Sequence, residues 1–179
     1  ASAYIKTKDI EAVEGASGYG AAILVFISAP SMPDTVDPEA ADFVSEFITG
    51  TTDETINDGW RRVSVTFTTP SDVSLVRFNG IIRGATGTAY FDGMQLEEGS
   101  ALSPYNMMEN GSFERSSNSF PTSWTKGNDI TSKETVDTSK KKHGNQSMKF
   151  GVSAGKKKNV YQTVKVAGKE SDTYNVSGW

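Results

Sequence analysis

The stretch GTAYFDGMQLEEGSALSPYNMMENGSFE, residues 87–114, lies near the middle of the chain and sets its organisation. Residues 88–97 alternate between apolar and polar and are rich in β-branched and aromatic side chains, a pattern typical of a strand. Turn-forming residues at 99–104 interrupt this pattern. A short apolar run followed by a turn begins again at 107–114. The stretch therefore indicates the end of one β-module followed directly by the start of another.

The rest of the chain is dominated by short alternating segments separated by turn signals. Residues 38–48 carry the only helical pattern, which is equally compatible with a loop leading into a strand at 44–49. Evenly spaced strands with almost no helix predict an all-β protein with a β-sandwich architecture. The strand candidates are 1–8, 20–28, 60–70, 73–82 and 87–96, then 130–136, 146–152, 159–166 and 173–179.

Composition excludes several classes of function. The 179 residues carry a net charge of −4, which argues against a general nucleic-acid binder. No apolar run approaches the roughly 20 residues of a membrane helix, so membrane insertion is not expected. Cysteine is absent, which excludes disulfides and thiolate sites. The chain starts at Ala1 without a methionine and ends at Trp179 within an apparent strand, so we expect it to be a piece of a longer protein.

Two phrases in the chain are shared with a known family. NGSFE at 110–114 is followed by Pro121 and Trp124, and AYFDGMQLEEG at 89–99 is followed by a Tyr-Asn pair. Here the chain resembles the carbohydrate-binding jelly-roll modules found in tandem in bacterial surface and wall-associated proteins. Such modules begin with a sequence like NGSFE and end with a sequence like AYFDGMQLEEG. In this chain the ending sequence precedes the beginning sequence. The resemblance implies a jelly-roll β-sandwich in an extracellular or cell-wall-associated protein.

The inverted order predicts a circularly permuted module. Residues 1–104, the first portion, would be the rear part of one repeat, and residues 105–179, the second portion, the front part of the next. VSGW at 176–179 matches ASAY at 1–4 in its small-Ser-small-aromatic pattern, so the two ends look like cut halves of one strand. We expect both portions to complete one sandwich as a monomer, since permutation is tolerated where termini lie close together. The alternative is completion by exchange between molecules, a domain-swapped oligomer.

The resemblance also implies a structural Ca²⁺. Its carboxylate ligands would be Asp92 and Glu114, with backbone oxygens at His143, Gly144 and Asn145 as further ligands. Hard carboxylate and carbonyl oxygens suit Ca²⁺, which takes six to eight of them. The alternative is that Glu114 pairs with a basic side chain and Asp92 caps the turn at Gly93.

A carbohydrate site would need exposed aromatic rings with polar neighbours. The candidates are Tyr4, Trp60, Arg77, Arg83 and Trp179. Trp60 and Trp124 are more often packing residues, and exposed strand arginines are normally only solvated. The basic runs at 140–143 and 156–158 look like hairpin tips kept soluble by charge, although attraction to anionic wall polymers would also follow from them.

Catalysis is not expected. His143 is the only histidine and lies in a basic, turn-like run, and the acidic residues cluster in loops. We therefore predict a non-catalytic module that binds a polysaccharide or cell-wall glycan. The alternatives are a structural spacer without a sugar site and an accessory module of a polysaccharide-degrading enzyme.

Overall fold

The computed structural model describes residues 1–16, 18–28, 43–69, 75–98, 106–166 and 173–174. Within these ranges the chain is built from strands, with one short 3₁₀ turn, η1 (Asn57–Gly59), and no helix that could span a membrane. The first portion contributes β1 (Ser2–Ala12), β2 (Gly20–Ser28), β3 (Phe43–Ile48), β4 (Arg61–Ser64), β5 (Phe67–Thr68), β6 (Leu75–Arg83) and β7 (Ala85–Gln95). The second portion contributes β8 (Ser116–Ser117), β9 (Phe120–Pro121), β10 (Thr125–Lys126), β11 (Thr135–Asp137), β12 (Ser147–Val152), β13 (Lys158–Lys165) and β14 (Thr173–Tyr174).

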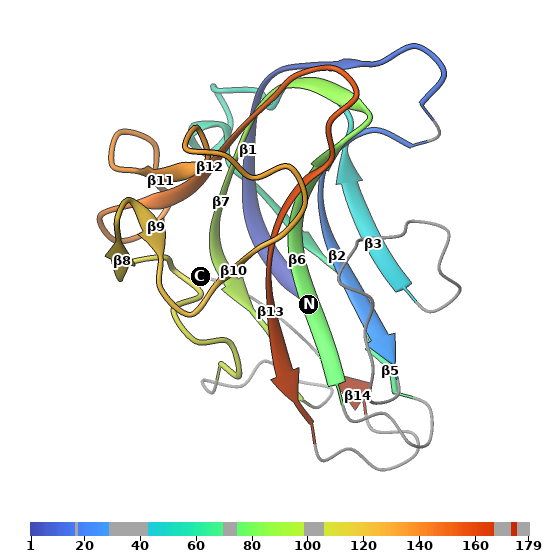
Figure 1. Cartoon of the computed structure of the whole chain (residues 1–179), viewed down its shortest axis with the longest axis vertical. Helices are drawn as coiled ribbons and strands as arrows, with labels where there is room; N and C mark the ends of the chain where they lie inside the picture. Colours follow the sequence, from blue (N-terminus) through green and yellow to red (C-terminus); the bar gives the residue numbers. More distant parts are fainter. Residues whose placement is uncertain (17, 29–42, 70–74, 99–105, 167–172, 175–179) are drawn as a thin grey trace.

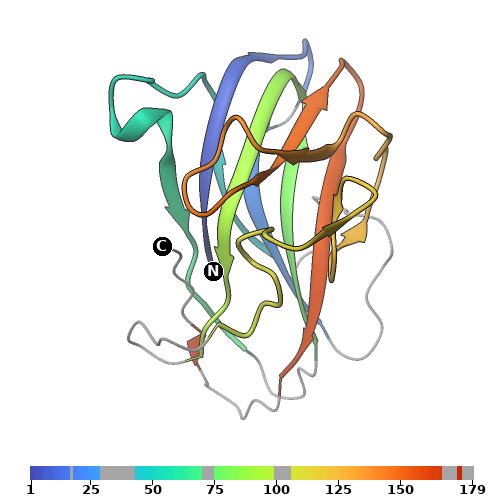
Figure 2. The ribbon, with the colours of Figure 1, turned by 90° about the vertical axis from the view of Figure 1, so that its left-hand side faces the viewer.

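Two five-stranded antiparallel sheets pack face to face (Figures 1 and 2). The first sheet has the order β11-β12-β7-β1-β4, and the second has the order β10-β13-β6-β2-β3. Two-stranded pairs, β5 with β14 and β8 with β9, complete the described pairing. The predicted all-β sandwich is therefore confirmed.

Both sheets contain strands from both portions of the chain. In the first sheet β12 pairs with β7, so that Met148 lies opposite Phe91. In the second sheet β13 pairs with β6 over its whole length, from Lys158 opposite Ile82 to Lys165 opposite Leu75. In Figure 1 the red β13 accordingly runs beside the green β6. The two portions thus share one interior, while their origin in successive repeats stays a prediction.

Alternate residues of the central strands fill the space between the sheets. Phe91 on β7 and Phe150 on β12 are fully buried, and their rings meet edge to face with centroids 5.3 Å apart. Gly80 on β6 faces Phe91 across the sandwich, where a Cβ would lie 3.2 Å from the ring. The missing side chain at position 80 therefore makes room for the phenyl ring of the opposite sheet.

Strand β2 is buried on both faces, which explains why GAAILVFIS is continuously apolar rather than alternating. Ile23 and Val25 belong to the interior between the sheets. Leu24 and Phe26 belong to a second buried cluster with Ile81 of β6, on the other face of the same sheet. A strand with one solvent-facing side would carry polar residues at these alternate positions.

Some strand predictions need correction in detail. The helical alternative at 38–48 is wrong for residues 43–48, which form β3, while 38–42 lie outside the described residues. The single strand expected at 60–70 is divided into β4 and β5. Of the last predicted strand only β14 is described, and the comparison of 176–179 with the N-terminus lies outside the described residues.

A buried ion pair fastens the turn before β11 to strand β13. The Lys158 ammonium lies 2.7 Å from Glu134 Oε1, and the exposed fractions of the two side chains are 8% and 0%. The other carboxylate oxygen accepts hydrogen bonds from the backbone N–H and the hydroxyl of Thr131, at 2.8 and 2.9 Å. Burial by itself raises the pKa of Glu134, but the hydrogen bonds from Lys158 and Thr131 outweigh it and hold the pKa below its ordinary value.

Because the two portions share one interior, a core substitution in one portion should also destabilise the other. Phe150→Ala should lower the free energy of unfolding by about 3–5 kcal/mol, because it removes a fully buried ring and leaves a cavity beside Phe91. Phe150→Leu should cost about 1 kcal/mol, since it keeps most of the apolar volume. Amide hydrogen exchange should show β7 and β12 losing protection together. Unchanged protection of β7 while β12 opens would contradict a shared interior.

The ion pair predicts a specific dependence of stability on pH. Because the folded-state pKa of Glu134 lies below its ordinary value of 4.5, its stabilisation is complete above that pH and is lost as the pH falls further. Glu134→Gln should lower the free energy of unfolding at neutral pH by about 3–5 kcal/mol, because it leaves the Lys158 ammonium buried without a counter-charge. It should also flatten the acid limb of a stability–pH curve measured by urea unfolding. An acid limb as steep as that of the wild type would contradict this assignment.

Candidate functional site

A groove lies along the side of the sandwich, where the edge strand of each sheet is exposed. Its walls come from the end of β3, the loop at 49–59 and the start of β4, and its volume is about 470 Å³. Ile56, 61% exposed, is the only large exposed apolar side chain among the described residues. The groove therefore combines apolar and polar surface. Its lining residues include Phe47, Thr49, Thr51, Thr52, Asp53, Ile56, Asn57, Trp60, Arg61 and Arg62.

The loop that forms the groove is anchored to strand β1. Thr7 and Thr52 exchange hydrogen bonds through their hydroxyl and backbone groups at 2.9–3.1 Å, and the Thr7 hydroxyl also donates to the Gly50 carbonyl at 2.8 Å. The buried Lys6 ammonium donates to the Asp58 carbonyl at 2.8 Å and pairs with Glu54 at 3.1 Å. These contacts fix the groove-forming loop onto the sheet.

Two further contacts shape the groove itself. Asp53 accepts hydrogen bonds from the backbone N–H and hydroxyl of Thr55 at 2.8 and 2.6 Å, and these bonds lower the pKa of its carboxyl. Glu46 on β3 accepts from the Ser64 N–H at 3.2 Å and lies 3.8 Å from the Arg61 guanidinium. Glu46 thus links β3 to β4, the edge strands of the two sheets, beside the groove.

The four predicted sugar-binding residues that the structure describes do not all lie at one site. Trp60 lines the groove but is only 5% exposed. Tyr4 lies on β1, where its ring meets His143 edge to face at 5.4 Å. Arg77 and Arg83 lie on β6 in the other sheet, and Trp179 lies outside the described residues.

The two arginines of β6 are engaged with aromatic rings. The Arg77 guanidinium is buried and lies 4.4 Å from the centroid of Tyr161. The Arg83 guanidinium lies 5.0 Å from the centroid of Phe47, which lines the groove, and burial lowers the pKa of Arg83. Arg83 is therefore adjacent to the groove, whereas Arg77 packs on the β13 side of β6.

Trp124 has a packing role. Its ring is 7% exposed, lies 5.0 Å from that of Phe113, and donates from Nε1 to the Asn110 carbonyl at 3.0 Å. This arrangement agrees with the packing alternative for Trp124.

The predicted metal carboxylates converge on one loop, residues 142–146. Asp92 Oδ2 accepts hydrogen bonds from the backbone N–H groups of Lys142 and His143 at 2.8 and 2.9 Å. Glu114 accepts from the N–H groups of Asn145 and Gln146 at 2.9–3.1 Å. Only Gly144 separates the two sets of donors. Its φ is +64°, and a Cβ there would lie 2.4 Å from Glu114 Oε1.

The electrostatics of this pair differ from those of ordinary surface carboxylates. Burial raises the pKa of Asp92 to about 6, against the opposing effect of hydrogen bonds from His143, Lys142 and Gly93. The neighbouring negative charge of Glu114 raises it further. Two acidic groups are thus held close together at the point where β7 meets the second portion.

The residues fit the carboxylate part of a Ca²⁺ ligand set, since two hard oxygen donors approach one loop. The backbone N–H groups of His143 and Asn145 donate to these carboxylates. The Gly93 N–H donates to Asp92 Oδ1 at 2.7 Å, which agrees with the alternative that Asp92 caps the turn at Gly93. No cluster of three or more acidic or histidine side chains occurs among the described residues. The resemblance implies backbone oxygens at His143, Gly144 and Asn145 as further ligands, and Ca²⁺ also accepts water and other oxygen ligands.

His143 is placed as a structural residue. Its ring packs on Tyr4 and its backbone N–H donates to Asp92. Burial and the neighbouring Lys142 lower its pKa.

Sequence reasoning missed most residues of the groove. Residues 51–59, TTDETINDG, were not among the predicted binding residues, although Ile56 among polar residues and the adjacent Trp60 were signals that the sequence offered. No family model, no curated protein and no solved structure matches this chain.

Proposed function

We propose that this chain is a non-catalytic carbohydrate-binding module that takes a glycan in the groove between β3 and β4. The observation that carries the proposal is the mixed lining of one open groove. Phe47 and Ile56 provide apolar surface for a sugar ring, and the hydroxyl, carboxylate and guanidinium groups around them match sugar hydroxyls. Its volume of about 470 Å³ falls within the usual range for small-ligand sites.

The anchoring of the groove supports this proposal. The loop at 49–59 is tied to β1 through Thr7 and Lys6, so little conformational entropy would be lost when a ligand binds. The ligand in this proposal is a polysaccharide or cell-wall glycan, and the module would act outside the cell.

A second candidate function is a structural spacer without a sugar site. The burial of Trp60 and Trp124 favours it, because neither ring offers a broad exposed face for stacking.

Removal of a groove guanidinium should weaken glycan binding. Arg61→Ala and Arg62→Ala should each lower affinity about tenfold, since a charge-assisted hydrogen bond contributes about 1.5 kcal/mol or more. Arg115→Ala provides a matched control, because Arg115 is exposed and does not line the groove. The measurement is affinity electrophoresis of the folded variants in gels containing cell-wall and plant polysaccharides. Failure of the wild type to bind any of them would favour the spacer, and equal losses in all three variants would contradict the groove.

We also propose that Asp92 and Glu114 hold a structural Ca²⁺, which would join β7 to the 142–146 loop. A ligand present at 100 times its dissociation constant stabilises the folded state by about 2.7 kcal/mol. Added Ca²⁺ should therefore raise the melting temperature by about 5–10 °C, and EDTA should reverse the rise.

Matched variants test the Ca²⁺ proposal. Asp92→Asn and Glu114→Gln should abolish the Ca²⁺-dependent rise in melting temperature, whereas Glu109→Gln, at an exposed carboxylate outside the pair, should preserve it. A wild-type melting temperature unaffected by both Ca²⁺ and EDTA would count against the site.

A further inference from the structure

A second cleft, separate from the groove, lies where the β12–β13 turn faces the segment at 129–133. Its volume is about 550 Å³, and it shares no lining residue with the groove. Thr88 and Ser153 contribute hydroxyl groups, and Gly151 leaves its surface open, since a Cβ at position 151 would meet nothing within 4 Å. Lys133, Lys156 and Lys158 also line the cleft, which we call the lysine cleft.

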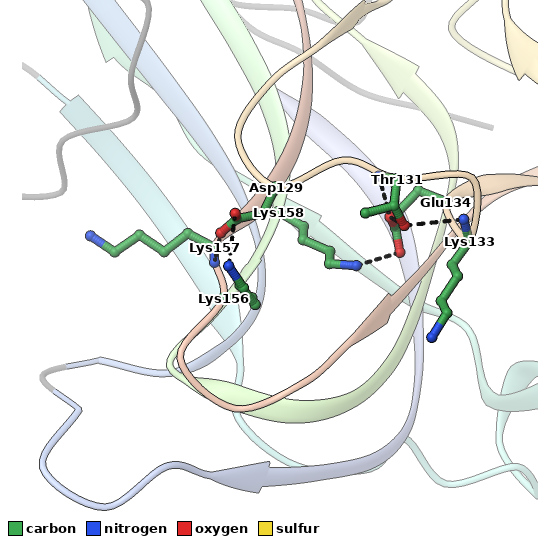
Figure 3. Close-up of polar contacts among 7 residues, drawn as sticks. All are labelled: Asp129, Thr131, Lys133, Glu134, Lys156, Lys157 and Lys158. Carbon is green, nitrogen blue, oxygen red and sulfur yellow. Dashed lines mark hydrogen bonds and ion pairs between the residues drawn. The ribbon is translucent and has the colours of Figure 1, made fainter.

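The ammonium groups of Lys133, Lys156 and Lys158 line the lysine cleft together with one carboxylate, that of Asp129 (Figure 3). Asp129 accepts from the Lys156 ammonium at 3.3 Å and from the Lys157 backbone N–H at 3.2 Å, and Glu134 is paired with Lys158. The side chains of Lys133 and Lys157 form no ion pair with any described residue, and Figure 3 shows Lys157 directed away from the cluster. Of the three ammonium groups that line the cleft, only that of Lys133 is therefore left without a counter-charge among the described residues.

The buried Lys158 supplies a second, independent indication. A lysine ammonium has three N–H donors. One donates to Glu134, and no other described residue accepts from this ammonium, although the side chain is only 8% exposed. Because a buried donor without an acceptor is costly, the two remaining donors are suited to an acceptor that enters the cleft.

The charge distribution of the whole chain points the same way. Residues 105–179 contain 12 Lys and Arg against 7 Asp and Glu, a net charge of +5, whereas residues 1–104 contain 6 against 15, a net charge of −9. The lysine cleft is therefore lined mainly by the basic portion of an acidic protein. Local positive potential of this kind attracts anionic ligands despite the overall sign.

We propose that the lysine cleft binds a phosphate group carried on a sugar or polyol unit. Lysine ammonium groups bind phosphate as point charges, and the hydroxyls of Thr88 and Ser153 provide neutral donors. The cleft volume exceeds what a single oxyanion needs, so it accommodates part of the unit that bears the phosphate. This site is distinct from the groove and does not depend on glycan binding there.

The test is a titration of the full chain, followed by NMR, with glucose 6-phosphate, inorganic phosphate and glucose. Glucose 6-phosphate should shift the amide signals of Thr88, Gly151 and Ser153, and the affinity should fall as salt is raised. Inorganic phosphate should shift the same signals more weakly, and glucose should leave them unchanged. Shifts confined to other residues, or equal shifts with glucose, would overturn the proposal.

Variants distinguish ligand binding in the lysine cleft from non-specific attraction of the phosphate to positive charge elsewhere on the protein. Lys133→Gln with Lys156→Gln removes two exposed ammonium groups of the cleft and should weaken glucose 6-phosphate binding by roughly three- to tenfold. Lys140→Gln with Lys141→Gln makes the same charge change outside the cleft and should alter affinity by less than about twofold. Equal losses in the two double variants would overturn the site. Because all four side chains are solvent-exposed or half-exposed, both variants should fold.

Discussion

The pairing of β12 with β7 is the constraint on which the rest of the structure depends. Strand β7 lies between β1 of the first portion and β12 of the second, so it connects the two portions within one sheet. Phe91 on β7 then packs against Phe150 on β12 and against the space left by Gly80 in the opposite sheet. A register shift of one residue would turn Phe150 out of the interior, because side chains alternate between faces. The apolar interior therefore fixes the register of the strands that the second portion contributes.

This arrangement decides where ligands can be held. The central strands are committed to packing, and β2 is buried on both faces. Free surface with both apolar and polar groups remains at the edges, where the loop at 49–59 follows β3 and the β12–β13 turn closes the opposite part of the sandwich. Loops held by a rigid scaffold are the usual carriers of binding residues. Both proposed sites follow this rule, and each is fixed to the sheets by a buried lysine, Lys6 or Lys158.

Sequence patterns predicted the sandwich and most of the long strands, because alternation and turn residues are local signals. The convergence of Asp92 and Glu114 on the 142–146 loop was also expected, from the resemblance. The described members of the predicted sugar-binding set do not all lie at one site, since the sheet in which a strand lies is decided by tertiary pairing. Tyr4 and Arg77 are in different sheets for this reason. Lys158 was expected at a solvated hairpin tip, and it is buried instead because Glu134, 24 residues earlier, supplies its counter-charge.

The opposite charges of the two portions connect the fold with its proposed ligands. A portion of net −9 beside a portion of net +5 favours association of the two parts of the chain. The two portions also make specific contacts, such as the hydrogen bonds that the backbone N–H groups of Lys142 and His143 donate to Asp92. In the lysine cleft the two carboxylates, Asp129 and Glu134, belong to the same basic portion and pair with Lys156 and Lys158, whereas the Lys133 side chain forms no ion pair with any described residue. The ammonium group of Lys133 and the two unused donors of Lys158 are the physical basis for expecting an anion from outside the chain there.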